Sequence, residues 1–221
     1  MDENTVTFSV LELFRMGGVF MWPLLVFSIA TVAIALERGI HLISHNLRMD
    51  DLKEKILPLL MADNQSMADN FSAARDYLLP LTKRRIGARV LLALVNRPGL
   101  SEHRMEKAVE AEAESCINSL ESGFNFLTAL GSLSPLTGFL GTVSGMIGAF
   151  RSIAEATDVN AQIVANGIYE ALITTVFGLI IAIIAMTAHS IFSHMVDKFA
   201  AETEKVCSDL ITELALRKHE D

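Results

Sequence analysis

The chain has 221 residues, of which 51% are hydrophobic, and it carries a formal net charge of −8. Its mean hydropathy of +0.40 is too high for an ordinary soluble domain, and its acidic balance argues against nucleic acid as a partner. The sequence has no GxxxxGK[ST] phosphate loop and no Cys/His cluster with metal-ligand spacing, so we expect no cofactor, no metal site and no catalytic residue.

The N-terminal region predicts a surface helix followed by a transmembrane helix. Residues 1–16 mix apolar and polar side chains as an amphipathic helix on the outer membrane surface does. Residues 17–36 (GGVFMWPLLVFSIATVAIAL) are uncharged and long enough to cross a bilayer. This segment lacks a basic leader and a small-residue cleavage site, so we interpret it as a retained transmembrane helix rather than a signal peptide.

Residues 37–100 predict a helical cytoplasmic insertion. We expect its helices to be interrupted at Pro58, Asp63-Asn64, Pro80 and Pro98-Gly99. Residues 86–95 are apolar but too short to cross a bilayer, which indicates a buried or interfacial helix.

From Ser101, an N-cap candidate, no residue predicts a helix end before Pro135. We therefore expect residues 101–150 to form one long helix that contains the second transmembrane segment. Residues 124–150 are 27 residues without a charge, but they include five glycines, Pro135 and several hydroxyl side chains. This composition is typical of a helix that touches other helices closely or lines a hydrated path. We expect Pro135 to kink it.

The C-terminal part predicts a periplasmic loop at 151–166, a long helix at 167–217 with the third transmembrane segment at 171–188, and a short cytoplasmic tail at 218–221. Below the membrane, both long helices carry apolar stripes, which predict either a coiled-coil-like bundle or a cover for the 37–100 insertion.

One face of each of the last two segments combines small and hydroxyl side chains. The face of the third segment consists of Ala171, Thr174, Thr175, Gly178, Ala182, Ala185 and His189; the matching residues of the second are Ser134, Gly138, Gly141, Thr142, Gly145 and Gly148. For the glycines we favour helix packing. The threonine hydroxyls either bond to their own helix or line a polar path, and we favour the path.

Basic residues predict the orientation. All lysines and arginines except Arg15 and Arg151 lie between residues 37 and 123 or after the third segment. The positive-inside rule therefore places the N-terminus in the periplasm and the long loop and C-terminus in the cytoplasm. Cys116 and Cys207 both fall on the cytoplasmic side, where we expect no disulfide.

Acidic residues are placed unusually for an ion-conducting protein. Glu170 precedes the third segment, where it is either a helix N-terminal acid or part of an ion pathway. No transmembrane segment has a charged residue near its centre. If the chain conducts ions, the titrating carboxylate must therefore come from a second polypeptide.

Three motifs in order resemble the ExbB/TolQ/MotA family of ion-driven membrane motors, and specifically its ExbB branch. They are GGVFMWPLLVFSIATVAIALER in the first segment, LSPLTGFLGTVSGMIGAF in the second and GIYEALITTVFGLIIAI in the third. Three segments rather than four are unlike a MotA-type stator subunit, and the GGxxMxPLL opening is unlike TolQ.

The resemblance implies an all-α membrane protein that forms a ring-shaped homo-oligomer, five-fold in this family, around an ExbD-like single-span partner with a membrane aspartate. It further implies that Thr142 and Thr175 face that aspartate, that Glu170 is the family glutamate, and that the ring drives a TonB-like protein in the bacterial inner membrane. Thr174 stands where ExbB proteins commonly have alanine, and its extra hydroxyl could serve a sodium ion.

We therefore expect ion-pathway residues at Thr142, Thr174, Thr175 and Glu170, and structural residues at Pro135, Gly138, Gly141, Gly145 and Gly178. The favoured function is a proton-driven motor subunit for outer-membrane transport. The alternatives are a sodium-driven relative, a TolQ-like envelope-maintenance subunit and a membrane scaffold that conducts nothing.

Overall fold

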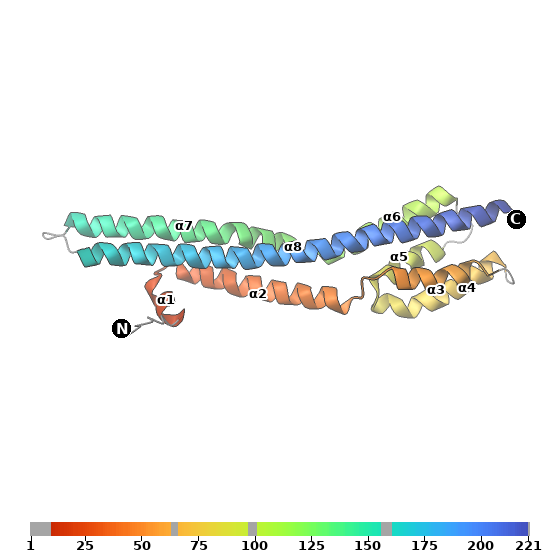
Figure 1. Cartoon of the computed structure of the whole chain (residues 1–221), viewed down its shortest axis with the longest axis horizontal. Helices are drawn as coiled ribbons and strands as arrows, with labels where there is room; N and C mark the ends of the chain where they lie inside the picture. Colours follow the sequence, from red (N-terminus) through yellow and green to blue (C-terminus); the bar gives the residue numbers. More distant parts are fainter. Residues whose placement is uncertain (1–9, 63–65, 97–100, 156–160, 221) are drawn as a thin grey trace, which may run out of the picture. The chain divides into compact units, whose positions relative to one another are not determined.

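The computed structural model describes residues 10–62, 66–96, 101–155 and 161–220, which contain helices and no strand (Figure 1). The helices are α1 (Val10–Met16), α2 (Met21–Ser44), α3 (Asp50–Leu60), α4 (Met67–Leu78), η1 (Leu79–Lys83), α5 (Ile86–Val95), α6 (Glu102–Glu121), α7 (Phe124–Glu155) and α8 (Ala161–Glu220). Three helical stretches, Met21–Ser44, Glu102–Glu155 and Gly167–Arg217, are long and apolar enough to cross a membrane. The all-α class and the number of spans predicted from the sequence are thus confirmed.

The chain folds as two compact units, which we describe separately. The span unit comprises Met1–Glu37 and Gly123–Ser190, and the loop unit comprises Arg38–Ser122 and Ile191–Asp221. The described part of the predicted N-terminal helix is α1; residues 1–9 of that prediction lie outside the described residues.

The expected uninterrupted helix from Ser101 to Pro135 is in fact two helices. α6 ends at Glu121, and Gly123 adopts a φ of 92° before α7 begins at Phe124. This left-handed conformation is accessible to glycine because glycine has no Cβ. Pro135, by contrast, lies inside α7 and does not end it. Its missing N–H costs one backbone hydrogen bond within a helix whose other bonds continue.

In the span unit, α7 and α8 run side by side and touch through their backbones (Figure 1). A methyl group at Gly138 would lie 2.7 Å from the carbonyl oxygen of Thr174, and one at Gly178 would lie 2.5 Å from that of Ser134. These positions leave no room for a side chain. The two glycines therefore set the distance between α7 and α8, as the sequence pattern predicts for small residues in membrane helices.

α2 packs on the other side of α8. Met21 and Leu24 of α2 are buried in one cluster with Ile173 and Ile181 of α8. The connection from α1 into α2 turns at Gly18, which has a φ of 65°. These contacts bring the start of α2 next to the first part of the third apolar segment.

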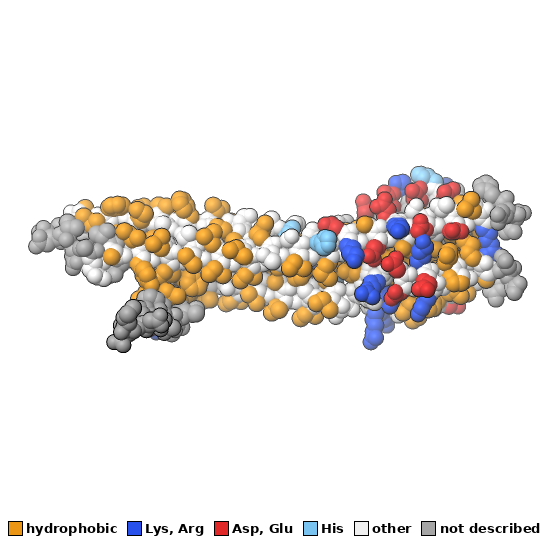
Figure 2. Space-filling view, in the orientation of Figure 1, with side chains coloured by type: hydrophobic (Ala, Val, Ile, Leu, Met, Phe, Trp, Pro, Cys, Tyr) orange, Lys and Arg blue, Asp and Glu red, His pale blue; other side chains and the backbone are white. Residues whose placement is uncertain are grey.

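The remaining faces of the spanning helices are apolar and uncovered. Leu136 and Phe139 on α7 are 63% and 64% exposed, and Ile183 on α8 is 66% exposed. Figure 2 shows hydrophobic side chains along α2, α7 and the first part of α8 in the span unit, whereas charged side chains gather on the loop unit. Apolar surface of this extent requires lipid or another chain as its neighbour.

The loop unit buries the short helix α5, as the sequence predicts, and the apolar stripes of the long helices. α8 is tied to the insertion at α3, where Lys53 pairs with Asp209 and holds the pKa of that carboxyl below its usual value. The Arg217 guanidinium donates to the carbonyl oxygens of Leu60 (2.9 Å) and Ala62 (3.0 Å) at the end of α3. α8 therefore covers the insertion, one of the two predicted arrangements.

The predicted interruptions of the insertion have mixed outcomes. Pro80 lies in the 3-10 turn η1, which separates α4 from α5. Pro58 lies inside α3 and does not interrupt it, a prediction that was wrong. The carbonyl that loses its partner there belongs to the exposed Glu54, where water can replace the missing N–H. Residues 63–64 and 98–99 lie outside the described residues.

The glycine contacts lead to a stability prediction with a matched control. Gly178→Ala should lower the stability of the detergent-solubilised protein by about 1–3 kcal/mol, because the new methyl group forces α7 and α8 apart. Gly148→Ala, with no atom of this chain within 4 Å of the new methyl group, should not lower the stability, because alanine favours the helix interior over glycine by up to about 1 kcal/mol. Chemical unfolding followed by circular dichroism measures both variants. Equal losses for the two would contradict the backbone contact.

Candidate functional site

Three threonine hydroxyls from α7 and α8 converge on one backbone carbonyl in the span unit. The side chains of Thr142, Thr174 and Thr175 each place Oγ1 3.2 Å from the carbonyl oxygen of Gly138. This approach is possible because Gly138 has no side chain to separate the helices, and Gly141 makes room in the same way beside Thr174. The structure thus brings together three of the four predicted ion-pathway residues and two of the predicted structural glycines.

The hydroxyls of Thr142 and Thr175 form a pair across the two helices, with their Oγ1 atoms 2.5 Å apart. A hydroxyl donates one hydrogen bond and can accept two. Only one member of the pair can donate to the other, and the second proton is left for a carbonyl or a further acceptor. The pair can therefore accept from a protonated carboxylic acid or donate to a carboxylate without moving either helix.

Exposure separates Thr174 from this pair. Thr174 is 1% exposed, and its hydroxyl donates to the Ala171 carbonyl oxygen at 2.8 Å. Thr142 and Thr175 are half-buried. Thr142 and Thr175 thus keep some accessible surface, whereas Thr174 is fully enclosed; the Thr142 hydroxyl also lies 3.2 Å from the carbonyl oxygens of Gly138 and Ala171.

Glu170 lies one helical turn before the threonines, in a cleft of about 330 Å³. The cleft is lined by Phe20, Gly141, Ser144, Gly145, Gly148, Ala149, Ser152, Gly167 and Glu170. Gly141 lies next to Thr174 and also lines this cleft. The half-buried Glu170 carboxyl group packs against Gly18, where any Cβ would meet it. The cleft therefore connects a carboxylate with the helix contact beside the hydroxyl pair.

Pro135 and Gly178 do not line this cleft. Gly178 contacts the backbone of Ser134, and Pro135 follows Ser134 in α7. The buried Ser134 hydroxyl donates to the carbonyl oxygen of Leu130 at 2.6 Å. This part of α7 therefore fixes helix packing, and the polar groups for chemistry lie nearer Gly141.

Five residues of this region were not among the predicted site residues: Gly18, Phe20, Ala149, Ser152 and Gly167. The spacing of small residues in α7 could have indicated Ser152, which follows Gly145 and Gly148 on the same face. Gly18 and Phe20 could not be found in this way, because their proximity to Glu170 depends on how the chain turns between α1 and α2.

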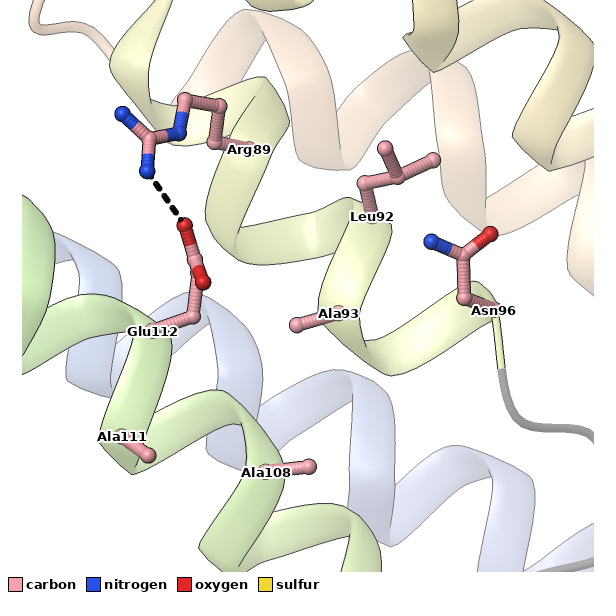
Figure 3. A pocket seen from close by; sticks show the side chains of 7 residues that line it. All are labelled: Arg89, Leu92, Ala93, Asn96, Ala108, Ala111 and Glu112. Atoms are coloured by element: carbon pink, nitrogen blue, oxygen red, sulfur yellow. Dashed lines mark hydrogen bonds and ion pairs between the residues drawn. The ribbon is translucent and has the colours of Figure 1, made fainter.

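The loop unit has a separate cavity of about 460 Å³ between α5 and α6, lined by Arg89, Leu92, Ala93, Asn96, Ala108, Ala111 and Glu112. Figure 3 shows the Arg89 and Glu112 side chains pointing toward one another across its edge, where they form a hydrogen-bonded ion pair of 2.8 Å. This pair satisfies the two charged groups of the cavity. The other lining groups, apart from the Asn96 amide, are aliphatic, so we assign the cavity no chemistry.

Comparison of the sequence with known proteins shows which family has these helices. A model of the MotA/TolQ/ExbB proton channel family matches residues 82–205, which include the end of the insertion, α6, α7 and most of α8. The chain belongs to the MotA/TolQ/ExbB proton channel family. Its membership, together with the three apolar helical stretches, makes it a multi-pass membrane protein.

Individual relatives place the chain in the ExbB-like branch of the family. It is 31% identical to an ExbB-like biopolymer transport protein of Synechocystis sp. over 89% of this chain and 77% of that protein. It is 26% identical to the biopolymer transport protein ExbB of Salmonella typhimurium over 86% of this chain and 78% of that protein. The Tol-Pal system protein TolQ of Pseudomonas aeruginosa is 35% identical, over 49% of each chain.

Proposed function

We propose that this chain is the ring-forming subunit of an ion-driven motor in a bacterial inner membrane, with its N-terminus in the periplasm and its C-terminus in the cytoplasm. In this proposal, an ExbD-like single-span partner supplies a membrane aspartate, and a TonB-like protein carries the resulting movement to the outer membrane. The subunit has no enzymatic activity of its own.

The observation that carries this proposal is the half-buried Thr142–Thr175 pair. Two hydroxyls 2.5 Å apart in an apolar segment can solvate a carboxylate or its protonated form from another chain. The chain itself has no Asp, Glu, Lys or Arg among residues 124–150 or 171–188. The pair is therefore equipped to receive a titrating group that this chain does not provide.

The exposed small-residue face of α7 supports a neighbouring helix at this place. Ser144 and Ser152 are exposed, and no atom lies within 4 Å of the position of a Gly148 side chain. This face borders the cleft that contains Glu170. A small, hydroxylated surface permits close approach of a second helix in a membrane, either from the partner or from another copy in the ring.

The environment of Thr174 favours protons over sodium as the driving ion. A sodium site needs several oxygen ligands that turn toward the ion, but the Thr174 hydroxyl is buried and donates its one proton to a backbone carbonyl, with the Ala171 oxygen at 2.8 Å and the Gly138 oxygen at 3.2 Å. A proton needs only the half-buried Thr142–Thr175 pair. Thr174→Ala should therefore leave ion coupling intact and lower stability slightly.

A non-conducting scaffold would need the same apolar surface but no half-buried hydroxyl pair. Substitutions that remove only the hydroxyl of Thr142 or Thr175 therefore separate the two functions. A TolQ-like subunit would use the same membrane chemistry as the favoured function but would drive a different protein. Identifying the protein that the complex drives therefore distinguishes the two roles.

Removing either hydroxyl of the pair should impair energised transport. Thr142→Val and Thr175→Val each take away a hydrogen bond to a charged group, worth about 1.5–3 kcal/mol, which corresponds to about tenfold to hundredfold slower ion passage. Thr137→Val is the matched control, since the Thr137 hydroxyl bonds only to the Leu133 carbonyl of its own helix. Transport rates at equal membrane levels measure the effect. Rates close to wild type for both pair variants would assign these threonines to packing.

The missing central carboxylate predicts that conduction needs two polypeptides. The purified chain in liposomes should give proton flux no greater than empty vesicles, and co-reconstitution with an ExbD-like partner should raise it. A pH-sensitive dye inside the vesicles measures the flux. A partner variant with asparagine in place of its membrane aspartate is the control, and rapid flux through the isolated chain would refute the division of roles.

A further inference from the structure

The basic segment at the end of η1 is not used by the proposed ion pathway. Lys83, Arg84 and Arg85 follow one another, and Arg85 pairs with Asp51 at the start of α3. Lys83 and Arg84 are exposed, and neither forms an ion pair with a described residue. Two positive charges are thus held on the loop unit with no protein partner among the described residues.

The chain path places this segment close to an apolar medium. Ile43, in the last turn of α2, is 80% exposed, and Ile40 one turn earlier is 66% exposed. Like the other uncovered apolar faces, these isoleucines need lipid or another chain as their neighbour, and lipid as the neighbour extends the hydrocarbon environment to about residue 43. The edge of the bilayer therefore lies close to the end of α2 at Ser44.

Residues 45–49 connect that edge to the basic segment. Met49 packs against Gly87 at the start of α5. Two residues after Met49, Asp51 pairs with Arg85, with 3.6 Å between a carboxylate oxygen of Asp51 and a guanidinium nitrogen of Arg85. Five extended residues span at most about 18 Å. Met49 therefore lies within about 18 Å of Ser44, a range comparable with the headgroup layer plus one Debye length at physiological salt. Lys83 and Arg84 precede Gly87, the residue that Met49 contacts, by four and three residues.

The surroundings of the two charges fit a lipid surface. Leu79 and Pro80 at the start of η1 are exposed, Leu79 at 52%, and so present apolar groups three to five residues from the basic side chains. Arg48 in the connection is a third exposed basic residue. Of the neighbouring acids, Asp51 is paired with Arg85, and the negative charge of Asp50 is offset at the N-terminus of α3.

We propose that η1 and the basic residues Lys83 and Arg84 bind the headgroups of anionic phospholipids in the leaflet next to the loop unit. The guanidinium and ammonium groups pair with headgroup phosphates, and Leu79 contacts the acyl-chain boundary. The contact fixes the insertion against the bilayer surface. It goes beyond the proposed motor function and does not require ion conduction.

A fluorescent probe next to the charges tests this proposal in the full-length chain. The variant Leu79→Cys carries an NBD label at the new thiol. The native Cys116 and Cys207 are 1% and 4% exposed, and labelling of the protein without the Leu79→Cys substitution gives the background. The labelled protein is placed in phosphatidylcholine vesicles that contain a minor fraction of either spin-labelled phosphatidylglycerol or spin-labelled phosphatidylcholine. Each spin label sits near the headgroup and quenches NBD nearby. No ion flux is measured, so failure of the motor function would leave this assay unchanged.

The spin-labelled phosphatidylglycerol should quench NBD more strongly than the spin-labelled phosphatidylcholine at equal mole fraction. Each basic residue favours the anionic lipid by about fivefold, and high salt should reduce the preference. Lys83→Gln/Arg84→Gln should bring the quenching ratio close to one. Lys55→Gln/Arg104→Gln, which removes two exposed charges elsewhere on the loop unit, should keep the wild-type ratio.

Three results would overturn the proposal: no quenching by either lipid, equal quenching by both in the wild-type background, or an unchanged ratio in Lys83→Gln/Arg84→Gln. Gel filtration of each variant checks that the protein remains folded. If Leu79→Cys disturbs the segment, Arg48→Cys carries the label instead, with the same direction of preference but a smaller ratio, because this variant removes one basic residue.

Discussion

The direct contact between the backbones of α7 and α8 is the constraint on which the site depends. Gly138 and Gly178 allow each helix to approach the carbonyl groups of the other. In an apolar medium, a polar group without a partner costs several kcal/mol. The close approach removes this cost for the threonines, because their hydroxyls reach the Gly138 carbonyl across the contact. Packing and polar chemistry in this part of the chain therefore cannot be separated.

This contact also divides the threonines by role. The hydroxyl of Thr174 is enclosed between the helices, where it bonds to backbone. Thr142 and Thr175 form their pair at the edge of the same contact. A helix pair with larger residues at 138 and 178 would hold these hydroxyls too far apart to bond. Glycine at these positions is thus required for the arrangement of the site, even though glycine itself contributes no polar group.

Much of this arrangement is predictable from the sequence because it follows from local rules. The length and polarity of 17–36, 124–150 and 171–188 indicate three spans, and the 3–4 spacing places the small and hydroxyl residues on one face of each helix. The spacing also indicates that Thr142 and Thr175 lie at comparable depth. It cannot specify which glycine meets which threonine, because that register depends on how the two helices pack.

The features that sequence reasoning missed are those that depend on one backbone conformation or on chain topology. Gly123 divides the predicted long helix through its positive φ, whereas Pro135 and Pro58 do not end the helices that contain them. A single glycine in a helical pattern is ordinarily tolerated, so its effect here was not evident. The position of Glu170 against Gly18 arises only when α1, α2 and α8 assemble.

The central claim is that the Thr142–Thr175 pair faces a carboxylate from another chain. Disulfide crosslinking in membranes tests it most directly: Thr175→Cys is co-expressed with an ExbD-like partner in which cysteine replaces the membrane aspartate. The account predicts a crosslinked species that contains both polypeptides, and no such species for Val176→Cys, whose side chain is 53% exposed at the same depth, about 100° around α8. Crosslinking at Val176→Cys without crosslinking at Thr175→Cys would contradict the account, since the partner would then lie on a different face of α8.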